Sequence, residues 1–272
     1  MGKIADAIDK YKADKEASKP KEFIAKPQRI EVEDTEVAFA REYIKERRYS
    51  EKLVALLAPD SVNAEVFKII RAVILHDKNR PAPKAIMVTS VLPGEGKTFV
   101  ASNLAVSFAM GMNEKVLLID ADLRRPSIHK MFGYANEYGL SEHLEGKKGI
   151  PELLIKTKIE KLTLLLSGNL PPNPAELLSS KKMEDFIKET KDRYQDRFII
   201  MDVTPSRLAA EANVIANHVD GIILVVMNGK APRAFLQQTV ENLGREKILG
   251  IVFNDFAQPF KYYKKYYSKY YK

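Results

Sequence analysis

A lysine, a threonine and two glycines stand together where a predicted strand gives way to a predicted helix. Residues 89–98 read TSVLPGEGKT. Gly94 and Gly96 allow backbone N–H groups to point inward, and the helix start adds the positive end of its dipole. This arrangement predicts a phosphate-binding loop in which Lys97 reaches the β- and γ-phosphates and the Thr98 hydroxyl binds Mg²⁺. The residues predicted to contact the phosphates of ATP are Pro93, Gly94, Glu95, Gly96, Lys97, Thr98 and Phe99.

Three carboxylates follow two further apolar runs. Asp120 and Asp122 follow the apolar run VLLI in the segment VLLIDADLRRP, and Asp202 follows FIIM in the segment FIIMDVTP. Because Asp120 and Asp122 lie two residues apart, both side chains project to the same side of an extended backbone. Carboxylates at strand ends can hold Mg²⁺ through water or accept a proton from a hydroxyl group. The predicted catalytic residues are Lys97, Asp120, Asp122, Asp202 and Arg124, and the predicted magnesium site comprises Thr98, Asp120, Asp122 and Asp202.

Six short apolar runs rich in Val, Ile and Leu alternate with helical stretches. Strands of this composition are buried on both faces, which is typical of a parallel sheet with helices on either side. We therefore expect a doubly wound, mostly parallel α/β fold of the P-loop NTPase type, in which ligands bind beyond the carboxyl ends of the strands. The predicted strands are residues 85–89, 115–119, 162–166, 198–201, 221–227 and 248–253, and the helix after the phosphate loop is residues 99–112.

A helix is also predicted upstream of the first strand. Ser61 is a favourable N-cap residue, and the helix is expected to run to about Asn79, before Pro81 and Pro83. Its apolar residues recur at helical spacing, which indicates one face packed against the domain. This inner face is expected to consist of Val66, Ile69, Ile70, Val73 and Ile74.

The composition excludes several classes of protein. The 272 residues contain no cysteine, so a disulfide scaffold, a thiolate zinc site and a cysteine nucleophile are ruled out. Apolar runs such as residues 222–227 are far shorter than the roughly 18–20 residues that span a bilayer, and the charged N-terminus leaves no room for a signal peptide. The net charge is +8, but the last twelve residues contribute five lysines and no acid, so the rest of the chain carries +3. We therefore expect a cytoplasmic protein without a basic face for nucleic acid.

Both ends of the chain differ from the middle in amino-acid composition and hydrophobic pattern. Residues 1–50 contain 12 Lys/Arg and 11 Asp/Glu without a strand-like run, and we expect a helical regulatory, partner-binding arm, or else a solvated leader. Residues 51–258 are the predicted catalytic domain, and residues 259–272 form a tail in which tyrosines alternate with lysines. Such a tail cannot form part of a hydrophobic core, because lysines separate its tyrosines. It could stack on single-stranded nucleic acid or lie on anionic lipid. Its tyrosines are Tyr262, Tyr263, Tyr266, Tyr267, Tyr270 and Tyr271.

The motifs TSVLPGEGKT, VLLIDADLRRP and FIIMDVTP together resemble those of the bacterial tyrosine kinases (BY-kinases), which use phosphate-loop machinery. The likeness continues through RRPSIHKMFG, GLSEHLEG and GNLPPNPAELL, and covers roughly residues 61–272. The opening MGKIADAIDKYK is similar to the arm of tyrosine autokinases encoded with exopolysaccharide export systems. The resemblance implies an ATP- and Mg²⁺-dependent autokinase that phosphorylates the tail tyrosines, between chains, and regulates exopolysaccharide polymerisation and export.

The same resemblance implies roles and partners. Asp120 is the candidate acceptor of the tyrosine proton, and Asp122 and Asp202 are candidate anchors of the metal-bound waters, although the roles of the first two acids stay open. Arg124 would stabilise the transferring charge, and Asn254 is a candidate adenine contact. The implied partners are further copies in a phosphorylation-sensitive ring, a membrane chain-length or activator protein that recruits the kinase to the inner membrane face, and a cognate tyrosine phosphatase, but no nucleic acid.

The chain departs from the family pattern at several positions. The oligomerisation motif E-x-x-R-x-x-R appears as Glu65, Lys68 and Arg71, so that lysine replaces the first arginine. Glu211 stands where aspartate is usual in the family, whereas Val91 departs only from the general phosphate-loop pattern, which has glycine at that position. Lys68 is expected to weaken bidentate pairing in a ring.

Two alternative functions remain at this stage. Positioning ATPases that move plasmids or septum proteins carry an extra lysine early in the loop, as KGGxGKT, where this chain has Leu92. A nucleotide-gated scaffold without kinase activity would use the same ATP-binding residues. Labelling of the tail by ATP separates the kinase from both.

Overall fold

The computed structural model describes residues 49–78, 80–193, 196–207 and 210–255. The predicted arm, apart from Tyr49 and Ser50, and the whole tyrosine tail lie outside these residues, so the division into three domains stays a prediction. Within the described residues no helix is both long and apolar enough to cross a membrane.

One seven-stranded sheet forms the centre of the domain, with the strand order β3-β4-β2-β5-β1-β6-β7. All neighbouring strands are parallel except β3, which runs antiparallel to β4. The predicted doubly wound, mostly parallel fold is confirmed. The strands are β1 (Ala85–Ser90), β2 (Lys115–Ala121), β3 (Leu154–Lys156), β4 (Leu162–Leu165), β5 (Arg197–Val203), β6 (Gly221–Met227) and β7 (Ile248–Asn254).

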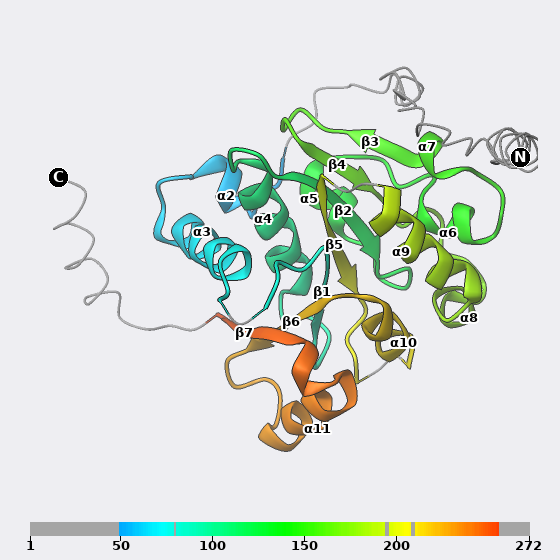
Figure 1. Ribbon diagram of the computed structural model, residues 1–272. Helices are drawn as coiled ribbons and strands as arrows, with labels where there is room; N and C mark the ends of the chain where they lie inside the picture. The colour runs from blue at the N-terminus through cyan, green and yellow to red at the C-terminus, as the bar shows by residue number, and fades with distance from the viewer. Residues whose placement is uncertain (1–48, 79, 194–195, 208–209, 256–272) are drawn as a thin grey trace, which may run out of the picture. The chain divides into compact units, whose positions relative to one another are not determined.

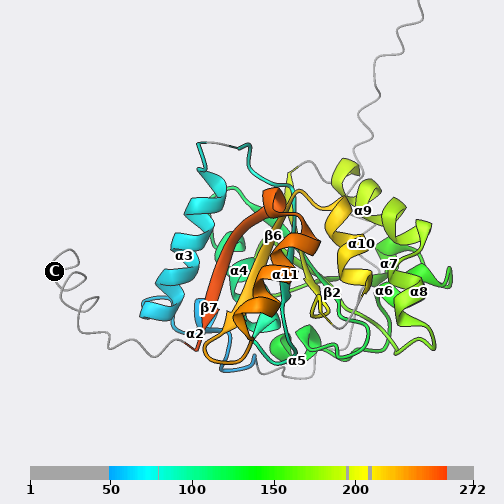
Figure 2. The ribbon, with the colours of Figure 1, turned by 90° about the horizontal axis from the view of Figure 1, so that it is seen from below.

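Helices cover both faces of the sheet because the central strands are apolar on both sides (Figures 1 and 2). One buried cluster joins the sheet to α2, α3, α4 and α5, and a second joins its other face to α6, α8, α9, α10 and α11. The helices are α2 (Val54–Leu57), α3 (Val62–Leu75), α4 (Lys97–Ala109), α5 (Ile128–Phe132), α6 (Leu140–Leu144), α7 (Ile150–Leu153), α8 (Pro174–Leu178), α9 (Lys181–Arg193), α10 (Ala210–His218) and α11 (Arg233–Leu243), followed by a 3₁₀ turn at Arg245–Lys247.

The topology brings the chemically interesting segments together. The phosphate loop follows β1, which lies between β5 and β6, and β2 lies on the far side of β5. In the parallel pairing of β2 with β5, Asp120 stands directly beside Asp202. Because the carboxyl ends of parallel strands meet at one edge, the glycine loop and the three predicted acids share that edge.

All six predicted strands are present, with ends that differ by up to two residues. The short antiparallel strand β3 was not predicted, because three residues give too little alternation to recognise. The helix after the loop is α4, which starts at Lys97 instead of residue 99, since Gly96 caps it in a left-handed conformation with φ of 94°.

The predicted inner face of α3 is wrong in large part. Val66, Ile69 and Val73 are 40%, 43% and 61% exposed, whereas Phe67 and Ile74 are buried. The spacing indicated a helix correctly, but its apolar residues spread over a wider arc than the arc that contacts α4, where Phe67 packs edge-on against Phe99. The helix also ends at Leu75, earlier than residue 79.

Candidate active site

The phosphate loop is built as its glycines predict. Gly94 and Gly96 have φ of 74° and 94°, values that residues with a Cβ rarely adopt. A Cβ on Gly96 would also collide with the side chain of Asn254, which donates a hydrogen bond of 2.9 Å from Nδ2 to the carbonyl oxygen of Glu95. Asn254, the predicted adenine contact, therefore lies against the loop itself at the end of β7.

Lys97 lies between two of the predicted acids. Its Nζ is 2.7 Å from Oδ2 of Asp122 and 3.2 Å from Oδ1 of Asp202. Burial alone would lower the pKa of the Lys97 ammonium group, but the carboxylates of Asp202 and Asp122 more than offset this and raise it. Lys97 therefore stays protonated, and its charge is available to phosphate oxygens at the loop.

Thr98 connects the loop to two neighbouring segments. Its hydroxyl donates a hydrogen bond of 2.5 Å to Oδ2 of Asp202 and lies 3.0 Å from the hydroxyl of Ser127. Ser127 precedes α5 and lines the same cavity. Sequence reasoning missed Ser127, because a serine after the second acidic motif carries no spacing signal of its own.

Asp120 and Asp122 differ in what they face, although they stand two residues apart. Asp120 is fully buried, and its carboxylate accepts hydrogen bonds from the backbone N–H groups of Asp122, Ser127 and Ile128 at 2.9–3.3 Å. Burial and the nearby carboxylate of Asp202 raise the pKa of Asp120. Asp122 instead lines the cavity and pairs with Lys97. Asp120 therefore shapes the segment between β2 and α5, while Asp122 is the one that can meet a ligand.

Glu95 has a position that the sequence did not predict. Its side chain is fully buried, with Oε2 accepting from the Leu92 N–H at 2.6 Å and Oε1 accepting from the Met227 N–H at 3.2 Å. Glu95 thus ties the start of the loop to the end of β6. Its carboxylate braces the loop from inside, and only its backbone can face a phosphate.

Arg124 pairs with Glu211, the residue left outside the predicted site. The Arg124 Nε lies 3.0 Å from Oε1 of Glu211 on α10. The Glu211 side chain is 2% exposed, and the Arg124 side chain is 47% exposed and lines the cavity. A buried carboxylate therefore orients the arginine that was predicted to stabilise transferring charge.

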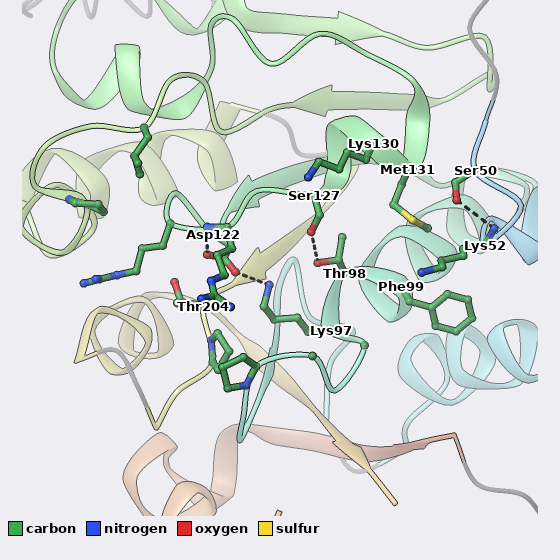
Figure 3. Close-up of a pocket in the computed structure, with 18 of the residues that line it drawn as sticks. Ser50, Lys52, Lys97, Thr98, Phe99, Asp122, Ser127, Lys130, Met131 and Thr204 are labelled. Atoms are coloured by element: carbon green, nitrogen blue, oxygen red, sulfur yellow. Dashed lines mark hydrogen bonds and ion pairs between the residues drawn. The ribbon is translucent and has the colours of Figure 1, made fainter. Parts of the chain in front are cut away.

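A cavity of about 1110 Å³ opens above the loop (Figure 3). Lys97, Thr98 and Asp122 form its floor, and the side chains of Lys52, Phe99, Lys130 and Met131 border it. Its full lining consists of Ser50, Lys52, Pro93, Gly94, Gly96, Lys97, Thr98, Phe99, Asp122, Arg124, Arg125, Ser127, Lys130, Met131, Leu170, Pro171, Pro172, Pro174, Thr204 and Pro205.

The proline-rich wall of this cavity is held by a second buried carboxylate. Glu142 accepts hydrogen bonds from the Gly139 N–H at 2.7 Å, from the Ser141 hydroxyl at 3.0 Å and from the N–H and Nδ2 of Asn169 at 3.3 and 3.0 Å. Burial alone would raise the pKa of Glu142, but these hydrogen bonds outweigh it and hold the pKa below its usual value. Asn169 directly precedes Leu170 and Pro171, so Glu142 positions the wall.

The acids at the floor suit a magnesium ion that arrives with a nucleotide. Within the described residues no three His, Cys, Asp or Glu side chains could hold a metal by themselves. Mg²⁺ commonly uses one or two carboxylates, keeps several waters and takes its remaining ligands from phosphates. Thr98, Asp122 and Asp202 offer oxygen donors of this kind, and two carboxylates against the single charge of Lys97 leave negative charge for a cation to neutralise.

The predicted oligomerisation residues lie on α3, apart from this cavity. Glu65 and Lys68 form an ion pair of 3.1 Å within the helix, and Arg71 donates a hydrogen bond to the carbonyl oxygen of Ser107 on α4. The six predicted tyrosine sites lie outside the described residues. The structure therefore brings together Lys97, Thr98, Asp120, Asp122 and Asp202, with Arg124 and Asn254 beside them.

The sequence of this chain is similar to those of a known domain family and of a curated tyrosine-protein kinase. Residues 83–243 match the family model described as an AAA domain. The chain is 38% identical over 209 residues to the tyrosine-protein kinase YwqD of Bacillus subtilis (strain 168), a match that covers 76% of this chain and 87% of YwqD.

Solved structures agree with the sequence relatives. The crystal structure of the chimerical protein CapA2B2 superposes with a TM-score of 0.71 and 29% identity, covering 83% of this chain and 99% of that one. The septum site-determining protein MinD of Pyrococcus horikoshii OT3, complexed with Mg-ADP, has a TM-score of 0.55 and 25% identity over 64% of this chain and 71% of its own. The chain is thus less similar to MinD, of the positioning ATPase class, than to YwqD and CapA2B2.

Proposed function

The chain belongs to the bacterial tyrosine-protein kinase family, and from this premise we propose that it phosphorylates the tyrosines of its own C-terminal cluster with ATP. The observation that carries the proposal is the position of Lys97, which starts α4 at the glycine loop and lies within 3.2 Å of both Asp122 and Asp202. Phosphoryl transfer depends mainly on positioning and on neutralising charge, and this group provides both.

ATP binding is assigned to the loop and its lysine. The backbone N–H groups of residues 93–99 cradle the phosphates at the start of α4, and Lys97 exchanges its carboxylate partners for phosphate oxygens. Arg124, oriented by Glu211, faces the charge that develops during transfer. Asn254 supports the loop through Glu95, and an adenine contact from the same residue is a further part of the proposal.

Magnesium is assigned to the Thr98 hydroxyl and, through water, to Asp202 and Asp122. When bound, Mg²⁺ neutralises charge on the phosphate oxygens. Thr98 and Asp202 are hydrogen-bonded to each other, so the two groups are already held close together.

The tyrosine proton is assigned to Asp122, which revises the expectation for Asp120. Asp122 lines the cavity, whereas Asp120 is fully buried and accepts three backbone hydrogen bonds. In the reaction the bond between the γ-phosphorus and its bridging oxygen breaks, and a bond to the tyrosine oxygen forms. The phenolic proton, with a pKa near 10 in free tyrosine, passes to Asp122, and ADP leaves.

Transfer between chains is the proposed route. Tyr262 and Tyr271 stand seven and sixteen residues beyond Asp255, an extended reach of roughly 23–58 Å, so both the same cavity and a neighbour's are accessible. We propose a ring of copies contacting through α3, supported by Val66, Ile69 and Val73, which are exposed beside Glu65 and Lys68. Phosphorylation of the tail would loosen this ring by repulsion between phosphates.

The partners and the cellular place are proposed on family grounds. They are a membrane chain-length or activator protein that brings the kinase to the inner face of the membrane, and a tyrosine phosphatase that resets the tail. The kinase would then control the polymerisation and export of an exopolysaccharide from the cytoplasmic side.

The test uses purified full chain, labelled ATP and Mg²⁺. We expect phosphotyrosine on the tail of the wild type, none in Lys97→Met, and none after deletion of residues 259–272. To separate the routes, Lys97→Met with its tail intact is mixed with the tail-less but active protein, and label on the Lys97→Met chain proves transfer between chains. ATP hydrolysis by the wild type without phosphotyrosine, even with the membrane partner's cytoplasmic segment added, would refute the proposal in favour of a scaffold or positioning ATPase.

A further inference from the structure

The cavity is lined by cationic side chains beyond those that the carboxylates at its floor neutralise. Among the described residues, five cationic side chains line it, and Asp122 is its one acidic lining residue. Lys97 and Arg124 are paired with carboxylates. The other three form no ion pair with a described acid, and we refer to them as the basic rim: Lys52, Arg125 and Lys130.

The basic rim is held close to the transfer point. Lys130 lies one turn beyond Ser127, whose hydroxyl contacts Thr98, and the Arg125 N–H donates to Oδ1 of Asp122 at 3.0 Å. The Lys52 carbonyl accepts a hydrogen bond of 2.9 Å from the Asn103 side chain on α4. Figure 3 shows Lys130 extending past Ser127, and Lys52 lying beside Phe99 and Met131. Three exposed cations that line the cavity thus stand on hydrogen-bonded backbone.

The positive charge of the basic rim does not complement the unmodified tail, which is the proposed substrate. The tail carries five lysines and no acid, so an unmodified tail is repelled by three further cations. A phosphotyrosine reverses the local sign, because it adds about −1.5 to −2 charges and three strong acceptor oxygens that Arg and Lys bind well. The reaction itself therefore produces the group that suits the rim.

The spacing of the tail tyrosines fits such a sequence of events. Three tyrosine pairs repeat every four residues, as Tyr262–Tyr263, Tyr266–Tyr267 and Tyr270–Tyr271. In an extended peptide, tyrosines four residues apart face the same side at about 13 Å. A tyrosine at the floor thus places its counterpart from the next pair within reach of a lysine or arginine at the edge.

We propose that the basic rim is a phosphotyrosine subsite, which binds a phosphate already on the tail and so promotes phosphorylation of the next pair. The proposal rests on the tail being the substrate. The competing occupant is the acidic stretch Glu31, Glu33, Asp34 and Glu36 of the arm. Phosphotyrosine is favoured because one group carries the charge of two carboxylates and is delivered to this cavity by the reaction.

The experiment uses full chain with all six tail tyrosines changed to Phe, acting on peptides of residues 259–272. Each peptide keeps Tyr266 as its one acceptor, with phosphotyrosine at position 262, phosphotyrosine at position 270, or Phe at both. We expect kcat/KM to be about tenfold higher for at least one primed peptide, mostly through a lower KM, which is the size of one charged hydrogen bond. The triple variant Lys52→Gln, Arg125→Gln, Lys130→Gln should bring the ratio close to one.

The matched control is the triple variant Lys156→Gln, Lys158→Gln, Lys188→Gln, because these lysines are exposed and do not line the cavity. It should keep the wild-type ratio of kcat/KM between primed and unprimed peptides. Equal rates on primed and unprimed peptides would overturn the subsite while leaving the kinase proposal intact, whereas no phosphorylation of any peptide or of the native tail would refute the proposed function. An unchanged ratio with a raised KM for ATP in the triple variant would assign the rim to the nucleotide. A quadruple variant of the acidic stretch, with Glu31→Gln, Glu33→Gln, Asp34→Asn and Glu36→Gln, tests the competing occupant. If it raises the rates on primed and unprimed peptides equally, and only while the basic rim is intact, the rim binds the acidic stretch of the arm and the phosphotyrosine subsite is refuted.

Discussion

Two groups of buried carboxylates support the same cavity, and they differ in the partners that they bind. Asp122 and Asp202 face the ammonium group of Lys97 and the hydroxyl of Thr98. Glu95 and Glu142 form no ion pair with a described cation and accept hydrogen bonds chiefly from backbone N–H groups and one asparagine. We call the first pair the floor acids and the second pair the bracing acids.

The two groups differ in which contacts are lost when the carboxylate is substituted. A floor acid pairs with Lys97 or Thr98, which can exchange the carboxylate for phosphate oxygens or a metal ion, so its contacts are exchangeable. A bracing acid accepts hydrogen bonds from backbone N–H groups, and leaving a buried donor of this kind unpaired costs about 1–3 kcal/mol. Substitution of a floor acid should therefore reduce activity more than stability, and substitution of a bracing acid should reduce stability first.

The largest expected effect on activity is that of Asp202→Asn. We expect the rate of tail phosphorylation at saturating ATP to fall about 10²–10³-fold, the usual cost of removing one preorganised charge at a transfer site. The free energy of unfolding without nucleotide should stay within about 1 kcal/mol of the wild type, because Lys97 keeps Asp122 and one of three crowded carboxylates is neutralised. Initial rates and urea unfolding measure the two quantities.

Asp192→Asn, at an exposed position of α9, serves as the control and should change neither quantity. A marked loss of stability in Asp202→Asn, with normal activity in the fraction that remains folded, would move Asp202 into the bracing group.

Glu95→Gln should show the opposite balance. Oε1 and Oε2 each accept one backbone N–H, and an amide nitrogen in place of one oxygen would face a donor with a donor. We expect the free energy of unfolding to fall by about 1–3 kcal/mol, and ATP to bind about tenfold more weakly because the loop loses its tie to β6. Urea unfolding and titration with a non-hydrolysable ATP analogue test both effects, with exposed Glu189→Gln as the control. Unchanged unfolding would show that the brace contributes nothing.

The two groups also differ in how far the sequence predicts them. The floor acids follow apolar strands at the carboxyl edge, and the topology of a parallel sheet then brings them to the loop. Glu95 was predicted only as part of the loop, and Glu142 only as part of GLSEHLEG, because their partners are backbone N–H groups. Every residue except proline supplies such a donor, so no residue type marks the partner in the sequence.

Glu142→Gln provides a smaller effect with a distinct pH dependence. The folded pKa of Glu142 lies below its ordinary value of 4.5, so its ionised form is favoured by folding. The stabilisation is therefore fully present above about pH 4.5 and is lost as the pH falls through the lowered pKa. We expect the variant to be about 1–2 kcal/mol less stable than the wild type at pH 7, with the difference shrinking at acidic pH.

Thermal or urea unfolding between pH 3 and pH 8 measures this difference, and Glu160→Gln, at an exposed position, corrects for general effects of charge. A difference that stays constant down to pH 3 would contradict the assignment, since protonated glutamate should behave much like glutamine.

The sequence predicts the strands of the fold more accurately than it predicts which side chains are exposed. Strands buried on both faces are recognised by composition alone, and all six predicted strands are present. The helix α3 shows the limit, because Val66, Ile69 and Val73 have the spacing of a buried face but are exposed. A periodic pattern gives the type of element, whereas the side that packs is set by neighbours such as Phe99, which contacts Phe67 from a position 32 residues further along the chain.

Glu211 tests whether a carboxylate can belong to both groups, because it is buried like a bracing acid and paired with a cation like a floor acid. Arg124→Gln leaves that buried carboxylate without its partner, whereas Glu211→Gln leaves a half-exposed guanidinium group that water can solvate. Because burial penalises an unpaired charge, the first variant should be the less stable by about 1 kcal/mol, and the second should lose only a few tenths. Glu211→Asp keeps the charge but shortens the side chain, so it should fall between them. If Glu211→Gln is the least stable of the three, the carboxylate stabilises the fold through contacts other than Arg124 and belongs with the bracing acids.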